Sequence, residues 1–90
     1  MTRRVRILVS GRVQGVCFRA ATQQQARKLL CKGFVRNLPD GQVEIVAEGA
    51  DDLLQKMIAL SRKGPFMAKV EKVVIEDIES IEQFSDFEIR

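Results

Sequence analysis

Apolar and polar residues recur along the chain with the periods of strands and helices. Residues 4–10 alternate between an apolar face and a face rich in arginine, which is the period of two expected of a β-strand. Residues 18–32 are predicted to be helical, because small and apolar side chains recur at helical spacing at Thr22, Ala26, Leu29 and Leu30, and at Gly33 just after the segment. This stripe lies opposite glutamine and basic residues, so the segment is predicted to be an amphipathic helix.

The remaining strands are short runs of β-prone residues. Residues 34–38 and 42–48 flank Pro39-Asp40-Gly41, a turn sequence whose glycine can adopt positive φ, and they are predicted to form a hairpin. Residues 70–76 and 84–89 supply two further strands. The first of these shifts its alternation phase within its first four residues, as a β-bulge would.

A second helix is predicted over residues 51–63. The segment begins with two aspartates, ends with Arg62 and Lys63, and is followed by Gly64-Pro65, which is a stop signal. Its predicted apolar face consists of Leu53, Leu54, Met57, Ile58 and Leu60. The signals for the start of this helix, for its apolar face and for its end therefore all predict the same segment.

The predicted order is β-α-β-β-α-β followed by a short strand. This order is typical of the α+β class and of the ferredoxin-like sandwich, in which two helices cover one face of an antiparallel sheet. The short C-terminal strand is an addition to that sheet. In such a fold strands one and two run parallel with strand three between them, so their ends emerge at one edge. We therefore expect the loop of residues 11–19 to neighbour Asn37.

Length and composition indicate one domain, residues 1–90, with enough hydrophobic residues (46%) to bury a core without metal or disulfides. No run approaches the roughly 20 apolar residues of a membrane span, and the N-terminus lacks a signal-peptide core. The chain is expected to be cytoplasmic and monomeric, without membrane contact, and with Cys17 and Cys31 reduced. A helix of about 13 residues would hold these cysteines roughly 20 Å apart, too far for a disulfide.

Charge is distributed unevenly along the chain. Residues 1–39 contain nine Lys and Arg and no Asp or Glu, whereas residues 40–90 contain six basic and all twelve acidic residues. The two parts therefore carry net charges of +9 and −6, within a total of +3. This asymmetry is compatible with an anionic ligand bound by the first part, and equally with charges that cancel once the chain folds.

The first predicted strand and helix are joined by Gly11-Arg12-Val13-Gln14-Gly15-Val16-Cys17-Phe18-Arg19. The glycines allow backbone N–H groups to turn inward as a concave nest, and the following helix adds its unpaired first-turn donors and positive dipole end. Arg19 stands at the start of that helix, where its guanidinium could clamp two phosphate oxygens. An ordinary strand-to-helix turn with a solvated arginine has the same pattern, so the loop residues alone leave both interpretations open.

These nine residues are similar to the signature G-x-V-Q-G-V-x-F-R of the acylphosphatase family. A second segment, Gly33-Phe34-Val35-Arg36-Asn37-Leu38-Pro39-Asp40-Gly41-Gln42-Val43-Glu44, resembles that family's G-[aromatic]-V-[basic]-N-x-x-D-G-x-V-E pattern. The likeness continues along the chain through Thr22-Gln23, Gly64-Pro65 and Asp86-Phe87. Two long motifs at matching spacing make the resemblance specific.

The resemblance implies the ferredoxin-like fold and hydrolysis of acyl phosphates to carboxylate and inorganic phosphate, without metal or another cofactor. It implies that Arg19 binds phosphate, that Asn37 positions the water, and that a phosphate cradle is formed by the backbone of Gln14, Gly15, Val16, Cys17, Phe18 and Arg19. Inorganic phosphate would be both product and competing ligand. The chain has no histidine and no serine placed beside a base, so it lacks the residues that most other hydrolytic mechanisms require.

Cys17 lies inside the first motif and has three possible roles. A thiolate beside an arginine and a helix N-terminus could attack phosphorus, as in phosphatases with a cysteine nucleophile. Those enzymes separate cysteine and arginine by five residues, whereas only Phe18 separates Cys17 from Arg19, so a nucleophile is the least expected role. A spectator is expected first and a redox-sensitive thiol second.

A binding module is the alternative to an enzyme. RNA-recognition domains share the predicted fold, and Lys32-Gly33-Phe34-Val35 is faintly similar to their aromatic strand motif. In those domains the motif lies on the third strand with aromatic partners on the first, whereas here it lies on the second and the first strand has none. We therefore expect no nucleic acid partner, although a catalytically silent anion-binding module or a regulatory domain of a larger enzyme stays open.

Overall fold

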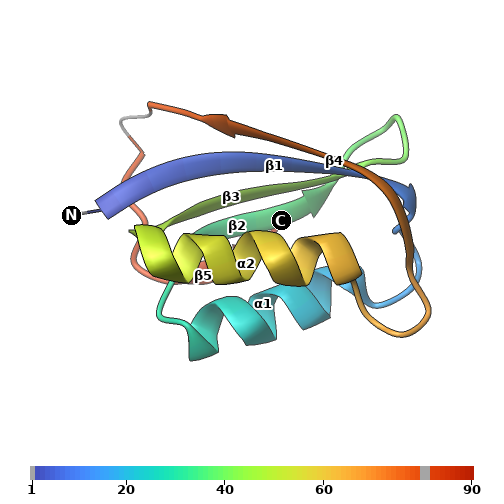
Figure 1. The fold of residues 1–90 in the computed structure, drawn as a ribbon, viewed down its shortest axis with the longest axis horizontal. Coiled ribbons are helices and arrows are strands. Elements are labelled where there is room, and N and C mark those ends of the chain that lie inside the picture. Colours follow the sequence, from blue (N-terminus) through green and yellow to red (C-terminus); the bar gives the residue numbers. More distant parts are fainter. Residues whose placement is uncertain (1, 80–81) are drawn as a thin grey trace.

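The computed structural model describes residues 2–79 and 82–90. Figure 1 shows two helices and a twisted sheet in an alternating order along the chain. The elements are β1 (Thr2–Arg12), α1 (Phe18–Lys28), β2 (Lys32–Asn37), β3 (Val43–Ala50), α2 (Asp51–Lys63), β4 (Lys69–Asp77) and β5 (Phe87–Ile89). The predicted order of elements is confirmed, and no helix of the described ranges is long and apolar enough to cross a membrane.

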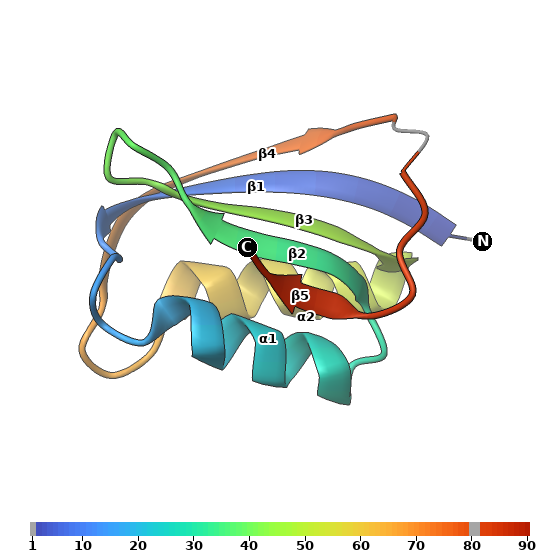
Figure 2. The same cartoon turned by 180° about the vertical axis from the view of Figure 1, so that it is seen from behind.

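The strands form one sheet in the order β4-β1-β3-β2-β5, and both helices lie on the same face of it (Figures 1 and 2). β1 pairs antiparallel with β3 and β4, and β2 pairs antiparallel with β3. β1 and β2 therefore run parallel on either side of β3, which confirms the ferredoxin-like α+β fold.

The C-terminal strand differs from the prediction in length and direction. β5 covers only residues 87–89 and pairs parallel with β2, so the five strands form a mixed sheet and not a purely antiparallel one. β4 and β5 lie at opposite edges of the sheet. The four strands before it keep the predicted antiparallel pairing.

The core lies between the sheet and the two helices. Val5, Ile7 and Val9 of β1 are fully buried, as the alternation of that strand predicts. Each side chain of this size removed from water contributes about 1.5–3 kcal/mol. From α2, Leu54 and Met57 pack into the same cluster. Leu60, predicted to join them, is instead partly exposed at the surface.

Helix α1 ends at Lys28, four residues earlier than predicted. Leu30 adopts the left-handed conformation with φ of 58°. Its N–H donates to Arg27 O at 3.2 Å, and the Cys31 N–H donates to Ala26 O at 2.9 Å. This is the Schellman arrangement, which usually has glycine where Leu30 stands. Leu30 is consequently exposed and not part of the apolar stripe, while Cys31 lies beyond the helix and is buried.

The bulge predicted from the sequence of β4 is confirmed. The register of β1 against β4 shifts between Ser10 and Gly11, which leaves Glu71 as the extra residue of β4. A Cβ on Gly11 would lie 2.2 Å from the carbonyl oxygen of Lys69, so only glycine fits this close approach. The bulge in β4 lies beside the end of β1, just before the chain enters the loop to α1.

The sheet face without helices is closed by ion pairs and aromatic rings. Glu44 accepts from Arg6 Nε at 2.6 Å and from Arg36 Nε at 2.5 Å, which links β1, β3 and β2. Phe34 is buried, with Phe84 packed edge-on at a centroid distance of 6.1 Å and the Arg90 guanidinium 4.2 Å from its ring centroid. Phe34 therefore offers no exposed ring on which a base could stack.

Candidate active site

The loop between β1 and α1 is fixed by apolar side chains that point inward. Val13, Val16 and Phe18 are buried in the core, whereas Gly15 and Cys17 between them are exposed. Gly15 has φ of 74° and Cys17 has φ of 63°, so the chain turns left-handed at both exposed positions. Such turns between anchored residues produce the concave backbone of an anion nest.

The backbone donors of this loop are available to a ligand. The Ala21 N–H donates to Cys17 O at 3.0 Å and is the first N–H of α1 to bond back to the loop. Within the described residues, the N–H groups from Gly15 to Ala20 donate to no acceptor. Together with the positive end of the α1 dipole, they form a site suited to an anion.

Arg19 and Asn37 lie on the same pocket, which has a volume of about 180 Å³. Its lining consists of Val13, Gly15, Cys17, Phe18, Arg19, Ala20, Asn37 and Ile89. Arg19 is half-buried and has no ion-pair partner among the residues that the structure describes. The fold thus brings together the two segments that the parallel arrangement of β1 and β2 predicts to be neighbours.

Asn37, at the end of β2, carries an unsatisfied polar atom. Its Oδ1 is buried and has no hydrogen-bond partner within residues 2–79 and 82–90. A buried amide oxygen without a partner costs about 1–3 kcal/mol, so such atoms in folded proteins commonly receive a hydrogen bond from a water or ligand. The side-chain Oδ1 of Asn37 is therefore suited to accept a hydrogen bond from a small molecule in this pocket.

The side chain of Gln14 joins the loop to the turn that follows Asn37. Its Nε2 donates to Leu38 O at 2.8 Å and to Gln42 O at 2.9 Å. The turn itself is closed by Leu38 N–H donating to Gln42 O at 2.8 Å and is joined to β1 by Gln42 Nε2 donating to Ser10 Oγ at 2.8 Å. These bonds hold the end of β2 against the loop.

The pocket differs from the sequence prediction in a few residues. Of the residues predicted to form the cradle, Gly15, Cys17, Phe18 and Arg19 line this pocket, whereas Gln14 and Val16 do not, and the Val16 side chain is buried in the core. Ala20 also lines the pocket, and its place in the first turn of α1 was a usable signal. Ile89 enters through the parallel pairing of β5 with β2, which no local pattern indicates.

The two cysteines are both free and differ in environment. Cys17 is exposed at the mouth of the loop, and Cys31 is buried beyond the end of α1. Burial raises the pKa of the Cys31 thiol, which keeps it protonated and unreactive. No group of three or more His, Cys, Asp or Glu side chains in the described part of the chain could hold a metal ion.

Comparison with known proteins connects this geometry to a family. The family model described as Acylphosphatase matches residues 5–89. The acylphosphatase of Marinobacter nauticus is 48% identical over 81 residues, which cover 90% of this chain and 88% of that protein. The crystal structure of acylphosphatase from Bacillus subtilis is 39% identical with a TM-score of 0.92, covering 100% of this chain and 99% of that one.

The same fold also occurs inside a larger protein. The crystal structure of T. kodakarensis HypF matches with a TM-score of 0.85 and 30% identity, covering 100% of this chain but 12% of that one. The two acylphosphatases, in contrast, are matched over most of their own length. Sequence, fold and coverage agree, and the chain belongs to the acylphosphatase family.

Proposed function

We propose that Arg19 and the backbone N–H groups from Gly15 to Ala20 bind the phosphoryl group of an acyl phosphate, and that Asn37 positions the attacking water. Membership of the family establishes the activity itself, which is hydrolysis of the bond between a carboxyl group and phosphate. One observation carries the assignment of residues: unbonded amide donors, an unpaired arginine and a buried unpaired amide oxygen share one pocket.

The chemistry of an acyl phosphate fits this small set of groups. Its leaving group is a carboxylate of low pKa, which needs little or no protonation. Phosphoryl transfer depends mainly on positioning and on stabilising the charge of the three equatorial oxygens. Arg19 can bind two of these oxygens through its planar fork, and the amide groups can bind the others. On this account no metal ion is required.

Asn37 can orient a water but cannot remove its proton at neutral pH, because an amide is not a base. Its Oδ1 would accept a hydrogen bond from the water and hold the water oxygen in line with phosphorus. We propose that the phosphoryl group of the substrate accepts the proton. The reaction is then complete within the pocket: water adds to phosphorus, the bond to the carboxylate oxygen breaks, and phosphate leaves with the proton.

Steady-state hydrolysis of benzoyl phosphate in EDTA tests the assignment. Arg19→Ala and Asn37→Ala should each lower kcat on the order of 100-fold, as expected for the loss of one preorganised donor or positioning group. Arg19→Lys should also be strongly impaired, since an ammonium cannot form the bidentate fork. Inorganic phosphate should inhibit the wild type competitively.

Arg27→Ala is the matched control, because Arg27 lies on the same helix and pairs with Asp86 at 2.8 Å, away from the pocket. It should retain wild-type kcat. Near-normal kcat in Arg19→Ala or Asn37→Ala would remove that residue from the mechanism. Loss of wild-type activity in EDTA would contradict a metal-independent reaction.

We propose further that the protein acts in the cytoplasm as a monomer and has no nucleic acid partner. The burial of Phe34 beneath Phe84 and Arg90 supports the last point, because a stacking platform needs an exposed ring. Salt-sensitive RNA binding by a chain that fails to hydrolyse benzoyl phosphate would favour a binding module instead.

A further inference from the structure

The pocket that contains Arg19 and Asn37 has an exposed apolar side chain in its wall. Ile89 of β5 lines this pocket and is 42% exposed. The other large apolar residues of the lining, Val13 and Phe18, are only 1% and 2% exposed, because their side chains belong to the core. Ile89 is therefore the largest apolar side chain that this pocket presents to a ligand.

The position of Ile89 is fixed on one side by contacts between β5 and α1. Asp86, just before the strand, pairs with Arg27 at 2.8 Å, and Gln23 Nε2 donates to Phe87 O at 3.0 Å. Phe87 is fully buried, and Ile89, two residues later, lies on the same face of the strand. These contacts proceed along α1 toward its start, and Ile89 lines the pocket together with residues of the first turn.

On the other side β5 is bonded to β2. Ile89 is paired with Val35 in parallel register, and the Arg90 N–H donates to Val35 O at 2.9 Å. Asn37 follows Val35 by two residues on the same strand and shares its face. Ile89 therefore adjoins both the helix start that is proposed to bind phosphate and the strand end that is proposed to bind the water.

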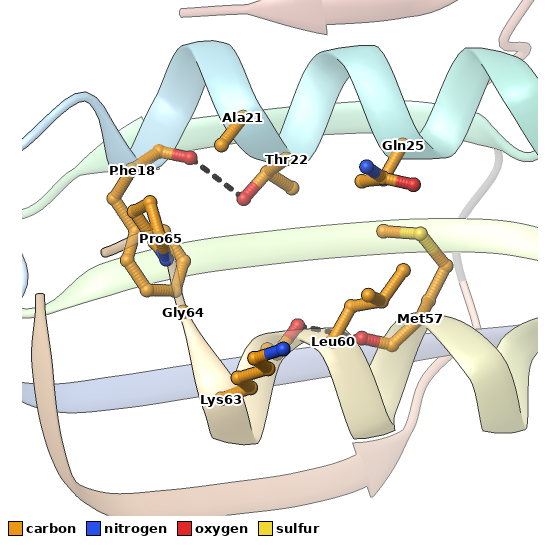
Figure 3. Close-up of a pocket in the computed structure, with 10 residues that line it drawn as sticks. Phe18, Ala21, Thr22, Gln25, Met57, Leu60, Lys63, Gly64 and Pro65 are labelled. Carbon is orange, nitrogen blue, oxygen red and sulfur yellow. Dashed lines mark hydrogen bonds between the residues drawn. The ribbon is translucent and has the colours of Figure 1, made fainter.

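A second pocket, of about 220 Å³, lies between α1 and α2 (Figure 3). Phe18 lines both pockets and is buried, so its side chain separates the two spaces. The second pocket is also lined by the polar side chains of Gln25 and Lys63. A group that is covalently joined to a phosphate in the cradle therefore contacts the walls of the pocket that holds the phosphate, and not this second space.

The chemistry of an acyl phosphate assigns a ligand to Ile89. Arg19 and the amide donors suit the phosphoryl oxygens, and Asn37 Oδ1 suits a water, so polar groups account for the polar parts of the reaction. The apolar part is the carbon skeleton of the acyl group, which gains free energy when contact with an apolar side chain removes it from water. Pockets that enclose drug-sized ligands measure about 300–1,000 Å³. This pocket, at about 180 Å³, has room for only the first carbon atoms beyond the phosphate.

We infer that Ile89 contacts the carbon atoms nearest the carbonyl of the acyl group, and that this contact makes the enzyme prefer short acyl groups larger than acetyl. The inference rests on the proposed function, since it takes the phosphoryl group to occupy the cradle. Ile89 determines specificity and takes no part in the chemical step. Carbon atoms farther from the carbonyl extend into solvent, so the preference reaches its limit at short chain length.

The test compares kcat/KM for acetyl, propanoyl, butanoyl and hexanoyl phosphate. In the wild type, kcat/KM should rise about two- to threefold for each methylene up to butanoyl, somewhat less than full burial would give, and then stay level. Ile89→Ala should reduce the ratio of butanoyl to acetyl phosphate to less than about twofold, whereas Ile89→Val should keep most of it. The inhibition constant of inorganic phosphate should stay within about twofold of wild type in both variants, since Arg19 and the amide donors are retained.

Val74→Ala is the matched control, because Val74 is 41% exposed on β4, at the opposite edge of the sheet. It should leave the whole series unchanged. A flat series in the wild type would overturn the inference and leave the proposed function intact. An equal loss of kcat for every substrate in Ile89→Ala would also overturn the inference, because Ile89 would then shield the water and not contact the acyl group. Near-normal kcat in Arg19→Ala would overturn both the proposed function and the inference.

Discussion

Cys17 occupies a backbone conformation that its side chain disfavours. Its φ of 63° and ψ of 21° lie in the left-handed region, at the residue that precedes the first turn of α1. A residue with a Cβ pays roughly 1–2 kcal/mol there, whereas glycine does not. The anchored neighbours Val16 and Phe18 hold the backbone in this conformation, because both side chains are buried. The strained turn belongs to the loop whose N–H groups donate to no acceptor among the described residues.

Cys17→Gly should therefore stabilise the protein by about 0.5–1 kcal/mol, which is the relief of strain less the added flexibility of glycine in the unfolded chain. Urea unfolding measures the change. Hydrolysis of benzoyl phosphate should stay close to wild type, as the spectator role requires. Leu30→Gly is a control of the same kind, because Leu30 has φ of 58° at the far end of α1. Loss of activity in Cys17→Gly alone would restore the nucleophile hypothesis.

The conformations of Cys17 and Leu30 could not be predicted from the sequence. Left-handed residues are predicted where glycine or asparagine occurs, and these two positions carry neither. The two signature segments were predictable, and one pocket is lined by part of the first, from Val13 to Arg19, and by Asn37 of the second. The unpaired Oδ1 of Asn37 was not, because burial of a single atom depends on packing from several elements.

At the scale of elements, Gln14 connects the loop that precedes α1 with the turn between β2 and β3. One amide group donates to two backbone carbonyls, at Leu38 and Gln42, on the two sides of the turn that follows Asn37. The sequence motif contains Gln14 and predicts a role for its backbone, but the partners of its side chain could not be read from a local pattern. Gln14 is separated from Leu38 and Gln42 by 24 and 28 residues, which is too far for the sequence rules for helices and turns to apply.

Gln14→Ala should lower kcat about tenfold, because a small displacement of Asn37 from the loop misaligns the water with phosphorus. It should also cost about 1–2 kcal/mol of stability for two lost hydrogen bonds. KM for benzoyl phosphate should change less than kcat, since the amide donors of the cradle are retained. Stopped assays and urea unfolding give the three quantities.

Gln23→Ala provides the control for this prediction. Gln23 Nε2 donates to Phe87 O at 3.0 Å, which is a bond of the same type between α1 and β5. Its loss should lower stability with little change in kcat. If both variants lower kcat in proportion to stability, Gln14 has only a structural role.

At the scale of the whole molecule, Glu44 joins the three central strands on the face opposite the helices. Its side chain is only 4% exposed. Burial raises the pKa of this carboxyl, but hydrogen bonds from Arg36 and Arg6 outweigh burial, and the pKa is lowered overall from its ordinary value of 4.5. A carboxyl with a lowered pKa in the folded state stabilises the protein above its unfolded pKa, and this contribution is lost as pH falls through the folded value.

Glu44→Gln should therefore cost about 2 kcal/mol at about pH 7 and progressively less as the pH falls to about 3. Urea unfolding across this range measures the difference between the two proteins. Glu76→Gln is the control, because Glu76 pairs with the same Arg6 at 3.0 Å but is 51% exposed. It should cost less than about 1 kcal/mol at either pH. A cost for Glu44→Gln that does not vary with pH would contradict the role of its charge.

The sheet order has a consequence for the folding reaction. The cradle follows β1 and Asn37 ends β2, yet β3 lies between these two strands and is formed by later residues. The two parts of the pocket therefore cannot meet through local contacts, and they come together only when a non-local sheet has been completed, which is a slow class of event. Enzymatic activity should therefore return late in refolding, after β1, β3 and β2 have paired. The rate at which activity returns then measures the rate at which the native strand order forms.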